Sequence, residues 1–119
     1  MHTDLTVRAT SVAPGHVRLQ VRGELDLGSA PLLHGALARA LPAATERLDL
    51  DLDGVVFLDA GGLGALVWCR QRALAAGAAC QVVALGPAVE RILLLTGTHA
   101  TLTCPGPAGR APAEAVQPA

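Results

Sequence analysis

The stretch Leu48-Asp-Leu-Asp-Leu-Asp-Gly-Val-Val-Phe-Leu-Asp-Ala-Gly-Gly-Leu-Gly64 decides the fold. Its first half alternates leucine with aspartate, which predicts a strand with one buried face that ends at Gly54. Asp59 stands where a helix N-cap belongs, because its carboxylate can accept hydrogen bonds from the N–H groups of the next turn. The helix is predicted to run to about Gly77, a natural C-cap.

The residues before this stretch predict a hairpin and a helix. Residues 4–12 and 16–22 alternate around a Pro-Gly turn signal, which is typical of an antiparallel hairpin. A helix is expected over about 29–41, with Ser29 as its N-cap. The aspartates of the central strand are expected to face solvent: Asp49, Asp51 and Asp53.

The residues after the stretch predict one more strand–helix unit. An apolar strand is expected over 79–84, a helix over 86–97 and a short last strand over 98–103. Beyond it, Pro, Gly and Ala dominate without periodicity, so we expect a disordered tail over 104–119.

Composition narrows the class of protein. A chain of 119 residues is expected to form one domain, and its net charge of −1 with no basic stripe argues against nucleic acid as a partner. No apolar run reaches the ~18–20 residues that cross a bilayer, so we expect no membrane insertion. No signal peptide is evident. Three cysteines without a CxxC spacing favour buried thiols in a reducing cytoplasm: Cys69, Cys80 and Cys104.

No constellation for catalysis or metal binding stands out. The four histidines share no ligand spacing with one another or with the cysteines, so no metal site is expected. Serine occurs only at positions 11 and 29, and no nucleophile–base set can be assigned. We therefore expect a protein that is not an enzyme and carries no cofactor.

Three motifs resemble one family. Residues 51–64 are similar to the STAS-domain signature of anti-sigma factor antagonists, D-L-S-G-V-x-F-[ILM]-D-S-S-G-L-G. Gly23-Glu24-Leu25-Asp26 and residues 86–97 match two further signatures of that family, in the same order. The resemblance covers about residues 4–103. It implies an α/β fold, a STAS-type sandwich whose mixed four- to five-stranded sheet is covered mainly on one side by helices, over residues 1–103.

The resemblance includes one departure. In the family, the second serine of D-S-S-G is phosphorylated by the anti-sigma factor, which is also a serine kinase. That serine falls on Gly61, and the serine before it falls on Ala60. No Ser or Thr occurs between Glu46 and Leu95. We therefore predict that the chain is not phosphorylated at the family site.

The resemblance also implies a partner surface on two loops and one helix. Alternatives stay open for several residues: Asp59 as a simple cap, the glycines as points of close packing or as an anion site, and the acidic residues 24 and 26 as a solvated loop. Trp68 either lies exposed beside Arg72 or is half-buried at the sheet margin. The candidate partner-binding residues are Glu24, Asp26, Asp59, Ala60, Gly61, Gly62, Gly64, Trp68 and Arg72.

The leading functional hypothesis is a cytoplasmic anti-sigma factor antagonist that binds a serine-kinase anti-sigma factor and so releases a sigma factor. It is expected to be a monomer or a weak homodimer. One alternative is a STAS accessory or scaffold subunit of a transporter or regulatory complex. Another is a module whose glycine turn binds a nucleotide or other anion.

Overall fold

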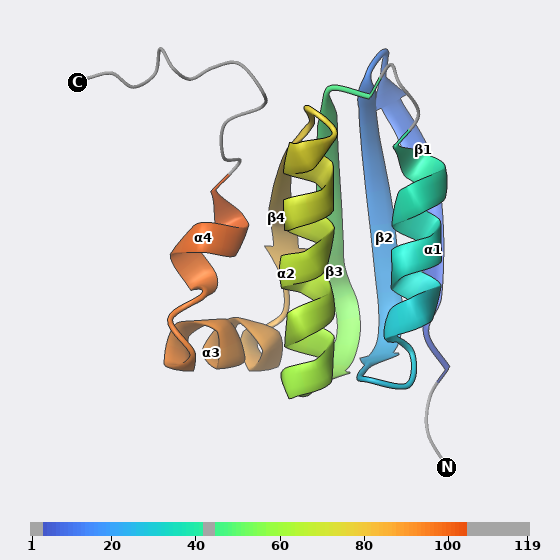
Figure 1. Ribbon diagram of the computed structural model, residues 1–119. Helices are drawn as coiled ribbons and strands as arrows, with labels where there is room; N and C mark the ends of the chain where they lie inside the picture. The colour runs from blue at the N-terminus through green and yellow to red at the C-terminus, as the bar shows by residue number, and fades with distance from the viewer. Residues whose placement is uncertain (1–3, 42–44, 105–119) are drawn as a thin grey trace, which may run out of the picture.

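The computed structural model describes residues 4–41 and 45–104, which form a four-stranded sheet with helices packed on one face (Figure 1). Helices α1 and α2 lie side by side across that face, and α3 and α4 follow beside α2. The elements are β1 Thr6–Ala13, β2 His16–Leu25, α1 Ala30–Ala40, β3 Arg47–Leu58, α2 Ala60–Ala75, β4 Ala79–Leu85, α3 Pro87–Leu95 and α4 His99–Thr103.

The sheet is mixed, with strand order β1-β2-β3-β4. β1 and β2 form the predicted antiparallel hairpin, closed by Gly15 at φ +76°, a left-handed conformation that favours glycine. β2, β3 and β4 run parallel, joined by the crossover helices α1 and α2. The predicted α/β sandwich is therefore confirmed, with four strands.

The core fills the space between the sheet and the helices. Leu19 and Val21 of β2 and Leu48 and Leu50 of β3 face it with at most 1% of their surface exposed. Leu66 of α2 packs against them from the other side. The side chains between these strand residues point to the opposite, open face, since neighbours along a strand alternate.

β3 does not end at Gly54, as the sequence predicted, but continues to Leu58. Its ladder with β2 absorbs two irregularities, one before Gly54 and one before Phe57, where β3 uses one residue more than β2. Each is a β-bulge that leaves the ladder intact on both sides. Gly54 is needed there because a Cβ atom would lie 2.6 Å from Cγ of Arg22.

The prediction of three solvent-facing aspartates is wrong for Asp49. Its carboxylate is on the outer face but only 1% of the residue is exposed. His16 Nε2 lies 2.6 Å, Arg47 Nε 3.3 Å and Arg18 Nη2 3.7 Å from its oxygens. β2 supplies His16 and Arg18 and β3 itself supplies Arg47, so the sequence of β3 alone does not reveal how this carboxylate is covered.

The predicted strand over 98–103 is also wrong, since these residues form the short helix α4. Gly97, at φ +74°, ends α3, and the chain then turns so that Leu102 packs into the core. Of the tail predicted over 104–119, residues 105–119 lie outside the described residues.

The cysteines differ in their surroundings. Cys69 and Cys80 are free and buried, as expected, whereas Cys104 is exposed. Burial raises the pKa of both buried thiols to about 12.

Candidate partner-binding site

Two loops leave the sheet at one edge. Leu25 and Leu58 are register partners in the parallel β2–β3 pair. Asp26 and Asp59 directly follow them, so both acids sit at the carboxyl ends of adjacent strands. This edge of the sheet, at the bottom of Figure 1, joins the start of α2 to the β2–α1 loop.

Asp59 caps α2. Its Oδ1 accepts a hydrogen bond from the Gly62 N–H at 2.9 Å, while its carbonyl accepts from the Leu63 N–H at 2.8 Å. The cap position predicted from the sequence is thus the one observed. It fixes the first turn of α2, whose N–H groups give this end a partial positive charge.

The β2–α1 loop is held by Asp26 and Ser29. The Ser29 N–H donates to Asp26 Oδ1 at 2.9 Å, and the Ser29 hydroxyl donates to the Glu24 carbonyl at 2.9 Å. The same hydroxyl accepts from the Asp26 N–H at 3.0 Å. Ser29 precedes α1 as predicted, but its side chain makes no hydrogen bond to the first turn of the helix. It fastens the loop instead.

Gly61 and Gly62 let this loop lie against α2. A Cβ atom on Gly61 would lie 2.8 Å from the backbone nitrogen of Leu27, and one on Gly62 would lie 2.1 Å from the Leu25 carbonyl oxygen. The space beside both glycines is therefore filled by the chain's own backbone. This favours the close-packing role over a nucleotide or anion site.

Ala60 and Gly64 present the accessible side of the same turn. Both are exposed, and nothing lies within 4 Å of the position of a Cβ on Gly64. A partner can thus approach α2 from this side without displacing the loop.

Three exposed apolar residues near this edge were missed by the sequence analysis. Leu27 is 76%, Val56 66% and Phe57 46% exposed. Leu27 lies against the start of α2, and Phe57 is paired with Glu24 on the outer face of the sheet. The signal was present in the run Val-Val-Phe-Leu at 55–58, since a strand with one buried face has no need of four consecutive apolar residues. Exposed apolar groups beside charged ones are typical of an interaction surface.

Trp68 and Arg72 form a second group, further along α2. Trp68 is half-buried and stacks on His34 of α1, with ring centroids 4.0 Å apart. The Arg72 guanidinium carbon lies 5.6 Å from the centroid of the Trp68 ring. Both line a groove of about 300 Å³ between α1 and α2, away from the Gly61–Gly62 turn.

Two other kinds of site are absent from residues 4–41 and 45–104. No helix there has both the length and the apolar character needed to cross a membrane. No three His, Cys, Asp or Glu side chains there gather in a way that could hold a metal ion.

The fold is that of a small α/β domain, and comparison with known proteins identifies its family. Residues 9–103 match the family model described as "Mlab, STAS domain". The chain belongs to the STAS domain family. No curated protein sequence matches it.

Solved structures show the same fold. An anti-sigma factor antagonist from Mycobacterium paratuberculosis is 30% identical, with 83% of each chain covered and a TM-score of 0.71. The unphosphorylated anti-sigma factor antagonist SpoIIAA is 16% identical, with 83% of this chain and 86% of that chain covered and a TM-score of 0.68. The murine Slc26a9 anion transporter is 15% identical, with 78% of this chain but 18% of that chain covered and a TM-score of 0.65.

Proposed function

We propose that this chain is a cytoplasmic anti-sigma factor antagonist that docks on an anti-sigma factor and is not controlled by phosphorylation at the family site. The observation that carries the proposal is the edge where Asp26, Asp59 and the first turn of α2 meet. This edge holds the candidate residues of the two loops and of the first turn of α2, without Trp68 and Arg72, and an anti-sigma factor antagonist with the same fold shares 30% identity over 83% of the chain.

The docking surface combines charge with exposed apolar area. The acidic loop residues lie beside Leu27 and Phe57, which a partner would remove from water. Gly64 leaves the helix start accessible. The proposal assigns the chain a binding role without catalysis, as a monomer or weak dimer.

The glycine in place of the family's serine is consistent with a protein that is able to bind its partner at all times. In the family the phosphate adds a charge of about −2 at this turn. Here Gly61 has no hydroxyl, and the Ser29 hydroxyl in the adjacent loop is engaged by backbone groups. Control would then rest on the abundance of the protein rather than on a kinase.

The test begins with identification of the anti-sigma factor by pull-down and continues with purified proteins. Gly64→Glu adds a charged side chain where the fold leaves open space. We expect it to weaken binding at least tenfold, about 1.4 kcal/mol. Thr101→Glu, on the exposed side of α4, adds the same charge elsewhere and is expected to bind like wild type. Equal affinities for the two variants, or no binding by wild type, would refute the proposal.

A second candidate is an accessory subunit of a transporter, a role that other members of the family fill. A part of the murine Slc26a9 anion transporter has the same fold, so the fold fits this role as well. Recovery of transporter subunits instead of an anti-sigma factor in the pull-down would establish this alternative.

A further inference from the structure

One edge of the sheet is uncovered. The outer strands are β1 and β4, because the strand order is β1-β2-β3-β4. Helix α4 lies beside β4, and only Val83 of that strand is exposed. In β1, by contrast, every residue except the half-buried Val7 is exposed. In the described part of the chain β1 pairs with β2 alone, so the backbone N–H and C=O groups of its outer side have no partner strand there (Figure 1).

The β1 edge lacks the features that usually keep an edge strand from pairing, which are prolines, several charges, bulges and short length. From Thr6 to Ser11, β1 pairs with β2 in an unbroken register, and the irregularity comes after it, next to the hairpin turn. This stretch holds no proline and one charged residue, Arg8. Its threonines and valine are β-branched, which suits a strand with neighbours on both sides. The edge can therefore accept a further strand.

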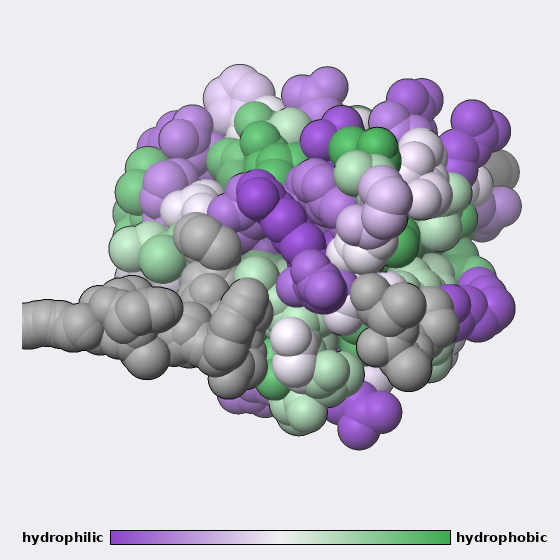
Figure 2. All heavy atoms as spheres, turned by 90° about the horizontal axis from the view of Figure 1, so that it is seen from above, coloured by the Kyte–Doolittle hydropathy of each residue, from purple (hydrophilic) through white to green (hydrophobic). Residues whose placement is uncertain are grey.

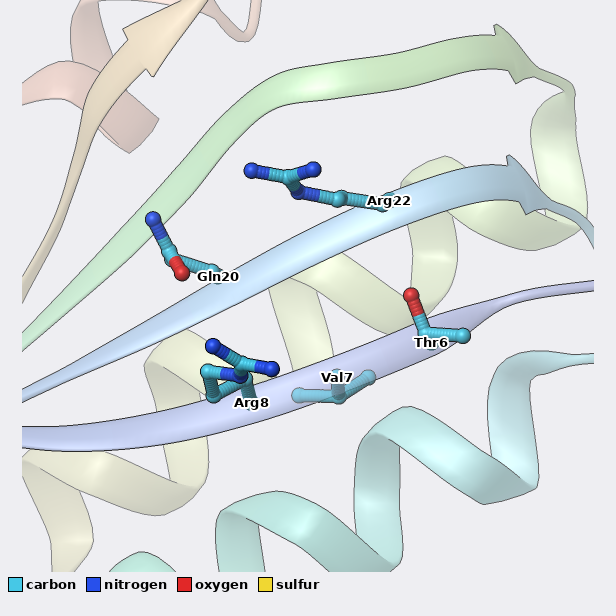
Figure 3. Close-up of a pocket in the computed structure, with 5 residues that line it drawn as sticks. All are labelled: Thr6, Val7, Arg8, Gln20 and Arg22. Carbon is cyan, nitrogen blue, oxygen red and sulfur yellow. The ribbon is translucent and has the colours of Figure 1, made fainter.

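The open face of the sheet beside this edge is polar. Figure 2, a view from above, shows hydrophilic side chains along much of the upper margin, which is the side away from α1 and α2. A hollow of about 400 Å³ lies there, lined by Thr6, Val7, Arg8, Gln20 and Arg22. Figure 3 shows Arg8, Gln20 and Arg22 standing on the same side of the β1–β2 hairpin. The hollow thus offers two guanidinium groups together with neutral hydrogen-bond donors.

Arg8 is the cation that this hollow leaves for a partner. Arg22 extends toward β3 and also lines a neighbouring hollow with Asp51 and Asp53, so carboxylates already offset its charge (Figure 3). Arg8 forms no ion pair with any residue of 4–41 and 45–104. Directly opposite side chains of adjacent strands have Cβ atoms ~4.5–5.5 Å apart, so an acidic residue of an added strand would reach Arg8. The open-face side of such a strand is therefore expected to be acidic.

The helix side of the same edge is apolar. Val7 and Ala9 alternate with the open-face side chains and so lie on the side of α1. Helix α1 adds Leu32, which is 47% exposed. His34 stacks on Trp68 of α2, and Leu32 lies about 200° from His34 around the helix, so it faces away from α2 and toward the β1 side. The helix-side residues of an added strand are therefore expected to be apolar.

We propose that the β1 edge binds an extended segment of another protein in which acidic and apolar side chains alternate. The segment adds a strand beside Thr6–Ser11, and backbone hydrogen bonds supply the main attraction. Its acidic side chains face Arg8 and the adjoining hollow, while its apolar side chains face Val7 and Leu32. Because strand side chains alternate with a period of two, these two requirements together select the register.

A second copy of β1 does not meet these requirements. The strand Thr6–Ala13 holds no acidic residue, so pairing of two β1 strands would leave Arg8 without a counter-charge. The charge of the edge therefore favours a partner of different sequence over self-association.

The β1 edge is separate from the proposed docking surface. Docking on the anti-sigma factor uses the start of α2 and the β2–α1 loop, at the bottom of Figure 1, whereas this edge runs along β1. Gly64→Glu should therefore leave binding at the β1 edge unchanged, and Arg8→Glu should leave binding of the anti-sigma factor unchanged. Failure of one proposal is thus distinguishable from failure of the other.

Fluorescence anisotropy tests the proposal with the full chain and a labelled synthetic peptide of alternating glutamate and valine, at low salt. We expect saturable binding, and a peptide of alternating lysine and valine should bind much more weakly. Arg8→Glu should weaken binding of the glutamate peptide about tenfold, because like charges then lie opposite each other. Arg91→Glu, which reverses an exposed charge on α3, should bind like wild type. Circular dichroism verifies that both variants fold.

Two further peptides separate strand addition from attraction between charges. One is N-methylated on its valine amides and the other on its glutamate amides. The amides of alternate residues point to opposite sides of an extended strand, so only one of the two sets faces β1. Methylation of that set should abolish binding, and methylation of the other set should not. Equal binding of the two methylated peptides would overturn the proposal.

Amide hydrogen exchange, measured by NMR, locates the peptide on the chain. We expect slower exchange at the outward-facing amides of Thr6–Ser11 when the peptide is bound. No binding at millimolar peptide concentration, or protection away from β1, would contradict the proposal. A wild-type dimer whose β1 amides are protected without peptide would also overturn it, because a second copy would then occupy the edge.

Discussion

Gly62 of α2 lies so close to Leu25 of β2 that a Cβ atom on the glycine would be 2.1 Å from the leucine carbonyl oxygen. Real Cβ atoms do not approach backbone oxygens at this distance, so any side chain at position 62 forces the β2–α1 loop and the helix apart. This contact ties the β2–α1 loop to the start of α2, which are the two parts of the proposed docking surface. It therefore connects the stability of the domain with the shape of its proposed interface.

Gly62→Ala is expected to destabilise the domain by about 1–3 kcal/mol, the usual cost of overpacking. Gly64→Ala, two residues on and with open space around it, is expected to stabilise it by about 0.5–1 kcal/mol, because alanine is the better helix former. Urea unfolding, monitored by circular dichroism, measures both. Equal stability of the two variants would mean that the loop does not pack on α2 in solution.

Asp49→Asn is expected to cost about 1–3 kcal/mol, because it removes a buried charge that faces His16, Arg18 and Arg47. Glu46→Gln removes an exposed charge three residues earlier and should change stability by less than about 0.5 kcal/mol. The midpoint of urea unfolding at neutral pH gives the comparison. If the two variants unfold at the same midpoint, the cluster around Asp49 contributes nothing to stability.

The order of strands and helices was predictable because it rests on local periodicity, as in the Leu-Asp alternation of β3. The prediction of a strand over 98–103 was wrong because six residues are too few for their periodicity to distinguish a strand from a helix. The packing of Leu102 into the core favours the helix. The prediction that Asp49 faces solvent was wrong for a related reason. Its burial depends largely on His16 and Arg18 of β2, which lie far away in sequence.

For the site, the cap at Asp59 was predictable because capping is local chemistry. The contact between Gly62 and Leu25 was not, since it depends on the β2–β3 register that brings two loops to one edge. The same register exposes Phe57, because the bulge before it turns this side chain to the outer face. Long-range strand pairing, rather than the preferences of single residues, therefore decides both the Gly62–Leu25 contact and the exposure of Phe57.

Stability is expected to fall at alkaline pH because of the two buried thiols. The pKa of Cys69 and Cys80 is raised by burial from 9.0 to about 12, so above pH 9 the unfolded chain releases protons that the folded chain keeps. The stabilisation is complete below pH 9 and is lost as the pH rises toward 12, with a slope approaching about 1.4 kcal/mol per pH unit for each thiol.

The absence of Tyr and Lys makes this measurement specific, because no other abundant side chain titrates near pH 10. Unfolding free energies are compared between pH 8 and pH 10.5 for wild type and for the double variant Cys69→Ala, Cys80→Ala. The double variant should lose much less stability over this range. Parallel losses in both proteins would show that the thiols are not responsible.

The stack of His34 on Trp68 is expected to hold α1 against α2. His34 Nε2 is buried without a hydrogen-bond partner in the described chain, so His34→Phe keeps the stack and removes an unsatisfied polar atom. We expect His34→Phe to be as stable as wild type or up to about 1 kcal/mol more stable, and His34→Ala to lose about 0.5–1.5 kcal/mol. Trp68 is the only tryptophan, so its fluorescence reports both transitions. A less stable phenylalanine variant would show that the imidazole makes a polar contact in solution.

Restoring a serine at the family position is expected to cost stability. Gly61→Ser places a Cβ 2.8 Å from the Leu27 backbone nitrogen, so the loop must shift, at about 1–3 kcal/mol. Ala60→Ser, at the exposed neighbouring position, should cost less than about 0.5 kcal/mol.

With the anti-sigma factor kinase identified by pull-down, we expect phosphate uptake by Gly61→Ser and none by wild type within residues 46–95. Mass spectrometry locates the phosphate. Phosphate uptake by wild type in that range would contradict the prediction that the chain is not phosphorylated at the family site. If Gly61→Ser is as stable as wild type, the loop moves easily, and packing does not explain the loss of the serine.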